Sequence, residues 1–454
     1  MAVSATNLDI NSIVTQLMTI ERQPLTELDL KEASYQAKIS AYGTIKGALS
    51  SLQSAVQTLA QPNTFKTLGI TSTDLSAVSG SATTSASPGT YNITVDQIAK
   101  ANSVRSNDAY TSSSDTFNTG TLSIKVGSGS PIDITIDATN NSLSGIRNAI
   151  NNANAGVSAS IVNDGTNQRL VLTSKTLGSN GAISVTATDS GSGGTFALSG
   201  LDSTSLVQLQ AADDAKFSVN GLAVTRSTNS VSDVVTGLTL NLGKAGSSTI
   251  TVSKDNSTAV NAITAFVTAY NAVVSQNSSL TAYDAATKTD SILTGDSTVR
   301  SIQDKLAGLI GASVSNVAGG LSHLSDVGLS LQKDGTLALD TAKLSLALND
   351  STKDVGSLFT QTTTGNTGIA VQFNTWLTSA TGSTGIIANR VDGMNASIGD
   401  LEDQRDALTS RLTLIEARYR SQYSALDALI SNMNSTSTYL EQQLAALPGA
   451  SSSK

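Results

Sequence analysis

A chain of 454 residues is long enough for about three domains. Its net charge is −8, only 14% of its residues are charged, and the sequence contains no stripe of basic residues. Nucleic acid and anionic membranes are therefore not expected as partners. The absence of cysteine excludes stabilisation by disulfides. No stretch approaches the roughly 18 apolar residues of a membrane span, and the N-terminus has no basic region, so we expect neither membrane insertion nor a cleaved signal peptide.

The N-terminal region, residues 1–66, predicts a short helix, an interruption at Pro24 and a long helix that ends near Ala60. The short helix is too short to be stable without a partner, and its apolar residues are Leu8, Ile13, Leu17 and Ile20. The long helix carries apolar residues spaced by three and then four, which are Leu25, Leu28, Tyr35, Ile39, Tyr42, Leu49 and Val56. Such a seam needs a second helix to bury it.

Between about residues 67 and 256 the apolar residues alternate with polar ones, which predicts strands. Expected strands include Tyr91–Val95, Thr121–Val126, Ile132–Ile136, Val157–Ile161, Arg169–Thr173, Ile183–Ala187, Lys216–Val219, Leu222–Thr225, Leu238–Leu242 and Ser248–Val252. One short helix is expected at Leu143–Ile150, and Asn220-Gly221 is a strong hairpin signal. We expect residues 109–207 to form a nested β-rich subdomain inside a second one, made of residues 67–108 and 208–256.

From residue 257 to 454 the helical period returns. We expect a helix through Val260 and Val274, a second one capped by Asp296, a hairpin around Lys333–Gly335, a linker at Thr362–Gly368 and a last long helix from near Ile387. The seam of this last helix contains Val391, Met394, Ile398, Leu401, Leu408, Leu412, Ile415, Tyr419, Leu426, Leu429, Met433, Leu440 and Leu447, with Leu444 beside it. The fold class predicted is therefore α+β and multidomain, with a coiled-coil or helical leg formed by both termini and an inserted β-rich head.

Nothing in the sequence forms a convincing catalytic, cofactor-binding or metal site. The single histidine, His323, lacks the company that a metal site requires. Asp213-Asp214 precede a strand without any supporting motif, and Gly191–Gly194 lacks the lysine of a phosphate-binding loop. Trp376 is expected to pack with Phe373 and Leu377. We expect no enzyme and no cofactor.

Segments along nearly the whole chain resemble, in the same order, the flagellar filament cap family, also called flagellar hook-associated protein type two. They are Leu8-Asp-Ile-Asn-Ser-Ile-Val-Thr-Gln-Leu-Met18, Ile20-Glu-Arg-Gln-Pro-Leu25, Gly89-Thr-Tyr-Asn-Ile-Thr-Val95, Gly221-Leu-Ala-Val-Thr-Arg226, Gly237-Leu-Thr-Leu240, Phe266-Val-Thr-Ala-Tyr-Asn271, Gly295-Asp296, Val327-Gly-Leu329, Asp334-Gly-Thr-Leu337 and Gln422-Tyr-Ser-Ala-Leu426. Residues Leu143–Thr173 also look like a small module of flagellin and hook-associated proteins, carried by Ala149-Ile-Asn151 and Gly156-Val-Ser-Ala159.

The resemblance implies a structural protein that leaves the cell through the flagellar export channel and assembles as a homo-oligomeric ring, a pentamer or hexamer, at the filament tip. It implies flagellin, hook-associated junction proteins and an export chaperone as partners, and the exposed head suggests binding of host mucin or glycans. The candidate contacts with sister copies and flagellin are the seam residues Leu8, Ile13, Leu17, Ile20, Leu25, Leu28, Tyr35, Ile39, Leu401, Leu408, Leu412, Ile415, Tyr419, Leu440 and Leu444.

Alternatives are open at this stage. For Leu401–Tyr419 an intramolecular helical bundle and a contact with other chains explain the seam equally well. Flagellin or a hook–filament junction protein would share the helical ends and variable middle, and a β-rich surface adhesin would use the head as a binding module.

Overall fold

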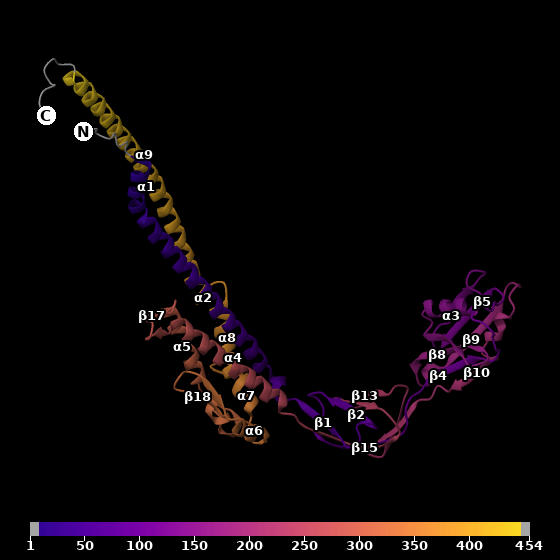
Figure 1. Ribbon diagram of the computed structural model, residues 1–454. Coiled ribbons are helices and arrows are strands. Elements are labelled where there is room, and N and C mark those ends of the chain that lie inside the picture. Colours follow the sequence, from indigo (N-terminus) through magenta and orange to yellow (C-terminus); the bar gives the residue numbers. More distant parts are fainter. Residues whose placement is uncertain (1–8, 446–454) are drawn as a thin grey trace. The chain divides into compact units, whose positions relative to one another are not determined.

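The computed structural model describes residues 9–445, which form two compact units (Figure 1). Of the described residues, the helical unit contains those up to Phe65 and those from Ala259 onward, and the β unit contains Lys66–Thr258. The predicted fold class is confirmed, because helices from both ends of the chain build one unit and the strands of the middle build the other. The helices of the helical unit are α1 (Ile10–Glu21), α2 (Gln23–Leu59), α4 (Ser257–Thr281), α5 (Ser297–Ile310), α6 (Thr341–Asn349), α7 (Val355–Thr360), α8 (Ile369–Thr381) and α9 (Ile386–Ala445).

The predicted interruption between α1 and α2 is present, but it lies at Arg22, two residues before Pro24. Proline has no N–H to donate, so it is well tolerated in the first turn of α2, where that N–H would have no partner within the helix. At the other end of α1 the Asp9 side chain accepts a hydrogen bond from the Ser12 N–H, 3.0 Å away. This cap satisfies one of the free donors of the first turn.

The core of the helical unit draws on α2, α4, α5, α8 and the start of α9. The later part of the predicted N-terminal seam is buried here, since Tyr42, Leu49 and Val56 have no exposed surface. The rings of Phe266 in α4 and Phe373 in α8 meet edge to face, with centroids 5.4 Å apart. Burying each such side chain contributes about 2 kcal/mol, so this core holds together segments from both ends of the chain.

Helix α4 differs from the sequence-based expectation in one respect. Its length and composition alone would let it cross a membrane. One face of the helix, however, is buried in the core of the helical unit, including Ile263, Phe266 and Val273. The structure therefore uses α4 as a core helix.

Three small hairpins lie between the helices, and they are β16 (Tyr283–Asp284) with β17 (Thr289–Asp290), β18 (Leu329–Leu331) with β19 (Leu337–Leu339), and β20 (Thr362–Thr363) with β21 (Asn366–Thr367). The hairpin predicted around Lys333–Gly335 is confirmed. The predicted linker at Thr362–Gly368 is wrong, because β20 and β21 pair across a turn with Gly365 at φ 78°. Helices α7 and α8 on either side of it were also missed.

In the β unit, one hydrophobic cluster lies between a five-stranded and a three-stranded sheet. The first sheet has the order β1-β15-β3-β11-β12, and the second has the order β13-β14-β2. The strands are β1 (Leu68–Ser72), β2 (Val78–Ala82), β3 (Gly89–Gln97), β11 (Ala215–Val219), β12 (Leu222–Arg226), β13 (Ser230–Val235), β14 (Leu238–Leu242) and β15 (Gly246–Lys254). Asn220 and Gly221 both have positive φ and form the predicted turn between β11 and β12.

The second hydrophobic cluster of the β unit is enclosed by two further sheets and α3 (Leu143–Asn152). Their orders are β10-β4-β8-β7 and β6-β5-β9. The strands are β4 (Ala101–Ser106), β5 (Gly120–Val126), β6 (Ile132–Ile136), β7 (Val157–Asn163), β8 (Gln168–Leu177), β9 (Ile183–Asp189) and β10 (Leu206–Gln210). Two clusters inside one unit are compatible with a nested subdomain. The sheet that contains β4 and β10 extends past the predicted boundaries at residues 109 and 207, so those boundaries stay a prediction that this sheet does not support.

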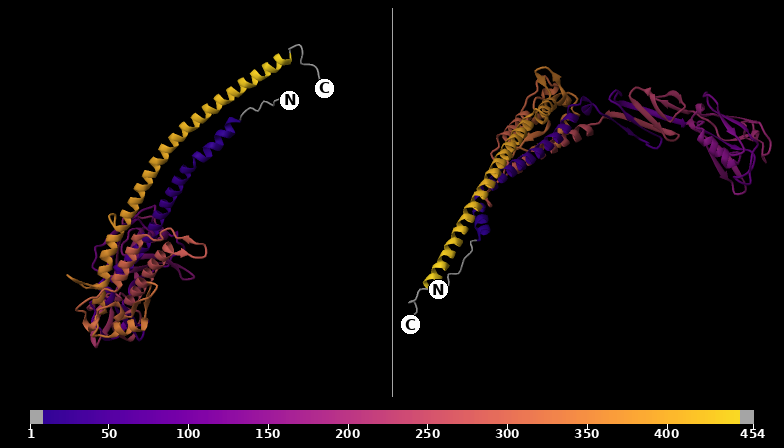
Figure 2. Two further views of the ribbon diagram at one scale, coloured as in Figure 1. Left: turned by 90° about the vertical axis from the view of Figure 1, so that its left-hand side faces the viewer. Right: turned by 90° about the horizontal axis from the view of Figure 1, so that it is seen from above.

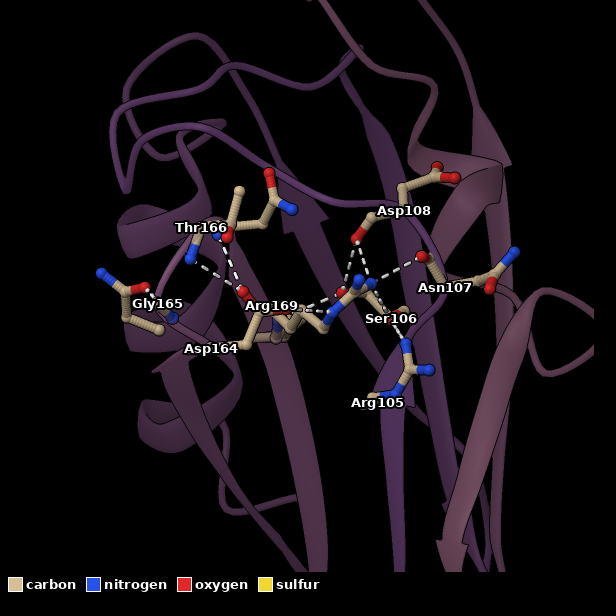
Figure 3. A network of polar contacts seen from close by, with 11 residues as sticks. Arg105, Ser106, Asn107, Asp108, Asp164, Gly165, Thr166 and Arg169 are labelled. Atoms are coloured by element: carbon tan, nitrogen blue, oxygen red, sulfur yellow. Dashed lines mark hydrogen bonds and ion pairs between the residues drawn. The ribbon is translucent and has the colours of Figure 1, made fainter.

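Arg169 ties the start of β8 to the loop that follows β4 (Figure 3). Its Nη1 donates to the backbone carbonyl of Asn107 at 2.7 Å, and its Nε donates to the Asp164 carboxylate at 3.1 Å. Both contacts serve the fold: the first satisfies a backbone carbonyl that the loop would otherwise leave unpaired, and the second joins Arg169 to the turn between β7 and β8.

Candidate assembly interface

The middle of the α9 seam, around Leu412, is covered by α1. Val14 and Met18 of α1 enclose Leu412 of α9, and all three are at most 5% exposed. Leu408, Ile415 and Tyr419 pack around them, half-buried. The short helix therefore does have a partner, which α9 supplies within the same chain.

Polar pairs hold the N-terminal helices against α9. The Tyr419 hydroxyl donates to Glu21 Oε1 at 2.9 Å, and this hydrogen bond raises the tyrosine pKa. Arg420 donates to Asn11 Oδ1 at 2.9 Å, and further along, Arg405 pairs with Glu32 at 3.0 Å. Since Arg405 occupies a polar position of the seam, this pair helps fix the register between α2 and α9.

Beyond Tyr423 no element within residues 9–445 covers the seam, because α9 runs on past the start of α1 (Figure 2). The apolar residues of this stretch are therefore exposed. Their exposed fractions are Leu426 41%, Leu429 57%, Met433 64%, Leu440 54% and Leu444 60%. We call these five residues the open seam; their spacing keeps them on one face of the helix.

The candidate contact residues before Pro24 also lie away from the contact with α9. Ile20 is 65% exposed, and Ile13 and Leu17 are half-buried, because α1 turns Val14 and Met18 toward α9 instead. Leu8 lies outside the described residues.

Along α2 and α9 the remaining candidates are half-buried: Leu25, Leu28, Tyr35, Ile39 and Leu401. Tyr35 and Leu401 line a surface groove of about 530 Å³ between α2 and α9, together with Lys31, Lys38 and Asp400. The chain thus leaves a groove and the open seam available on one unit.

The residues considered for chemistry have structural roles. His323 is exposed, and its Nδ1 lies 2.8 Å from Ser322 Oγ. Asp214 accepts hydrogen bonds from the N–H and hydroxyl of Ser179, which fixes the loop after β8, while the backbone of Asp213 pairs with Lys100. Trp376 is half-buried against the core that contains Phe373 and Leu377. Residues 9–445 contain no group of three or more His, Asp or Glu side chains able to hold a metal ion.

The two ends of the chain match known families. The Flagellar hook-associated protein 2 N-terminus family matches residues 6–102, and the corresponding C-terminus family matches residues 212–435. Flagellar hook-associated protein 2 of Escherichia coli K12 is 36% identical, over 96% of this chain and 96% of its own length. The chain belongs to the flagellar hook-associated protein 2 family. The resemblance found in the sequence motifs is thereby confirmed.

Other members of the flagellar hook-associated protein 2 family agree with this assignment. The A-type protein of Pseudomonas aeruginosa is 33% identical over 97% of this chain and 96% of its own length. The crystal structure of the D1-D2-D3 domains of the flagellar cap protein FliD from E. coli superposes with a TM-score of 0.64 at 35% identity, covering 78% of this chain and 99% of that one. The Flagellin hook IN motif matches residues 121–176, around the module predicted at Leu143–Thr173. A member of this family is a structural flagellar cap protein and not an enzyme.

Proposed function

We propose that this cap protein works as a homo-oligomer at the distal tip of the filament, where other polypeptides cover the open seam of α9. The observation that carries the proposal is the change along one seam: α1 buries Leu412, while Leu429 and Met433, on the same face further along, are more than half exposed. A continuous apolar face that is only partly covered within its own chain is typical of an assembly surface. Covering the rest by a sister copy or by flagellin would contribute on the order of 5 kcal/mol.

The finer features of this proposal follow from the family resemblance. The oligomer is a ring of five or six copies, and its partners are flagellin, the hook-associated junction proteins and, before export, a chaperone. The protein reaches the extracellular tip through the flagellar channel, without a cleaved signal peptide. For the β-rich head we propose two subdomains, residues 67–108 with 208–256 and residues 109–207, with host mucin or glycans as further ligands.

The open seam offers a direct test with a matched control. The double variant Leu429→Gln, Met433→Gln removes apolar surface from the seam, and Leu414→Gln removes it from a leucine off the seam that is even more exposed (73%). Each variant is returned to the bacterium in place of the native gene. We expect the seam variant to melt at the native temperature yet to shed flagellin as monomer into the medium, and Leu414→Gln to build normal filaments. Normal filaments from the seam variant would contradict the proposal.

A further inference from the structure

The uncovered part of α9 continues the seven-residue register of the part that α1 covers. Counted from Leu412 as position a of the repeat, four residues of the open seam fall at a or d: Leu426, Leu429, Met433 and Leu440. One seam therefore runs through Tyr423, the last residue of the cluster shared with α1. A seam of this kind is buried by another helix, and within residues 9–445 no helix covers it beyond Tyr423 (Figure 2).

No charge lies where it would repel an identical helix. Residues 421–445 contain two charged side chains, Asp427 and Glu441. Each directly follows a residue at position a and so occupies position b, on the outer side of a helix that buries its a and d residues. Positions e and g, where charges select the partner and the orientation in coiled coils, carry only uncharged residues over this stretch. Two copies can therefore meet face to face without like-charge repulsion at the contact.

Two polar residues in the seam distinguish the possible orientations. Thr436 and Gln443 occupy d positions, and both are exposed. In a parallel pair in register each meets its own copy, and every apolar residue of the seam meets an apolar one. In an antiparallel pair a residues meet d residues, so the alignment centred on the open seam sets Thr436 against Met433 and Gln443 against Leu426. The parallel register is therefore the one that keeps polar side chains away from apolar ones.

We propose that the open seams of sister copies cover one another, in a parallel bundle of α9 helices in register. This inference rests on the proposed function and names the partner at that surface: a second copy of this chain instead of flagellin. A partner of another sequence would have to present polar groups opposite both Thr436 and Gln443, whereas an identical copy does so by symmetry.

The width of the apolar face indicates that the bundle contains more than two helices. Ile430 and Leu444 occupy position e, and Tyr439 occupies position g. Tyr439 and Leu444 are each 60% exposed. A narrow face of a and d residues alone is typical of a two-stranded coiled coil, whereas a face that includes e or g residues is typical of a helix in a larger bundle.

Cross-linking tests the register directly, because the chain has no cysteine of its own. Leu426→Cys, Met433→Cys and Leu440→Cys each place one thiol in the seam of the full-length protein, and Thr438→Cys places one at the exposed position f, on the opposite face. With a short bismaleimide we expect each seam variant to give at least five times more linked chains than Thr438→Cys. An antiparallel pair would link Met433→Cys alone, since its two Leu426 positions lie about 25 Å apart along the axis. That result, or equal linking in all four variants, would overturn the proposal.

Substitution of seam residues tests the pairing without cysteine. Thr436→Leu replaces a polar residue of the seam by an apolar one, so we expect sedimentation of the full-length chain to give a dissociation constant at least threefold lower. Leu429→Gln should raise the dissociation constant at least tenfold, and Leu414→Gln, off the seam, should leave it unchanged. A dissociation constant that neither seam substitution moves would overturn the proposal.

The self-pairing and the proposed function can fail separately. If the double variant Leu429→Gln, Met433→Gln sheds flagellin while the seam cysteines do not link, another polypeptide covers the seam: the proposed function stands and the self-pairing is overturned. If the seam cysteines link while that double variant builds normal filaments, the self-pairing is supported and the proposed function fails.

Discussion

The hydroxyl of Tyr42 on α2 donates to Oδ1 of Asp296, 2.6 Å away, although 254 positions separate the two residues in the chain. The same carboxylate caps α5 by accepting from the N–H groups of Thr298 and Val299, and it pairs with Arg390 of α9 at 3.1 Å. The Asp296 side chain is only 6% exposed. One buried carboxylate therefore joins the helices from both ends of the chain to the body of the helical unit.

The contribution of the Tyr42–Asp296 hydrogen bond to stability can be measured as a coupling energy between the two residues. Tyr42→Phe loses one hydrogen bond to a charged acceptor, so we expect it to lower the free energy of unfolding by about 2 kcal/mol. Asp296→Ala loses that bond together with the cap of α5, for about 3 kcal/mol. Urea unfolding of the two single variants and the double variant measures the coupling. We expect about 1–2 kcal/mol, and strictly additive effects would mean that Tyr42 and Asp296 do not stabilise each other.

The same pair predicts a loss of stability at both extremes of pH. Burial alone would raise the pKa of Asp296, but hydrogen bonds from Tyr42 and Arg390 hold it below 3.8. Because the folded-state pKa is lowered, this carboxylate stabilises the fold above about pH 4, and its contribution is lost as the pH falls through the lower, folded-state value.

Burial, and then the contact with Asp296, raises the pKa of Tyr42 from 10.0 to about 12. The protonated hydroxyl thus stabilises the fold fully below pH 10, and this contribution is lost as the pH rises toward 12. Unfolding by urea across the pH range checks both limbs. Asp296→Asn should reduce the loss of stability at acid pH. Tyr42→Phe should reduce the loss at alkaline pH, although Tyr270, whose pKa is also raised, still contributes to it. Unchanged limbs in these variants would contradict the assignment.

Leu412 provides a test of how α1 is held. A carboxylate at this position, 5% exposed between Val14 and Met18, cannot stay buried without a partner, so Leu412→Asp should release α1 from α9. Hydrogen exchange of the α1 amides should then quicken at least tenfold, while amides in the buried part of α2 keep their protection. Leu414→Asp, on the opposite, exposed face of the same helix, is the control and should leave α1 unchanged. Slow exchange of α1 in Leu412→Asp would show that other contacts hold it.

Much of this fold could be predicted from local patterns. Asp296 was expected to cap α5 because an aspartate before an apolar-periodic segment is a strong start signal, and the structure confirms it. The hairpin at Asn220-Gly221 followed from the turn type that these two residues favour. Such features depend on neighbours in sequence, which a single chain displays directly.

Features that depend on tertiary packing were not predictable in the same way. A repeat of 3.5 residues shows that a seam needs a partner, but it does not say that α1 covers Leu412 and stops short of Leu429. Strands β2 and β13 were missed: β2 consists mostly of small residues, Ser232 and Asp233 interrupt the valines of β13, and both strands gain order from pairing with β14.

Gly237, just before β14, lies so close to the backbone at Ala86 that we expect no other residue to fit there without cost. Its φ is 74°, and a Cβ there would lie 2.4 Å from the Ala86 nitrogen. Gly221 also has positive φ, 83°, but open space around its Cβ position. Both alanine substitutions introduce backbone strain of about 1–2 kcal/mol, whereas Gly237→Ala must also displace the backbone at Ala86. We therefore expect Gly221→Ala to cost about 1 kcal/mol and Gly237→Ala about 3 kcal/mol or more.

The measurement is hydrogen exchange of the β2 and β14 amides during mild urea denaturation of the full-length chain. Exchange should quicken far more in Gly237→Ala than in Gly221→Ala, because the strain lies where β14 pairs with β2. Trp376, the single tryptophan of the chain, belongs to the helical unit, so its fluorescence transition serves as an internal reference and should not move. Equal exchange rates in the two variants would mean that the Ala86 backbone moves aside without cost. The close approach of Gly237 to Ala86 would then not explain the glycine at this position.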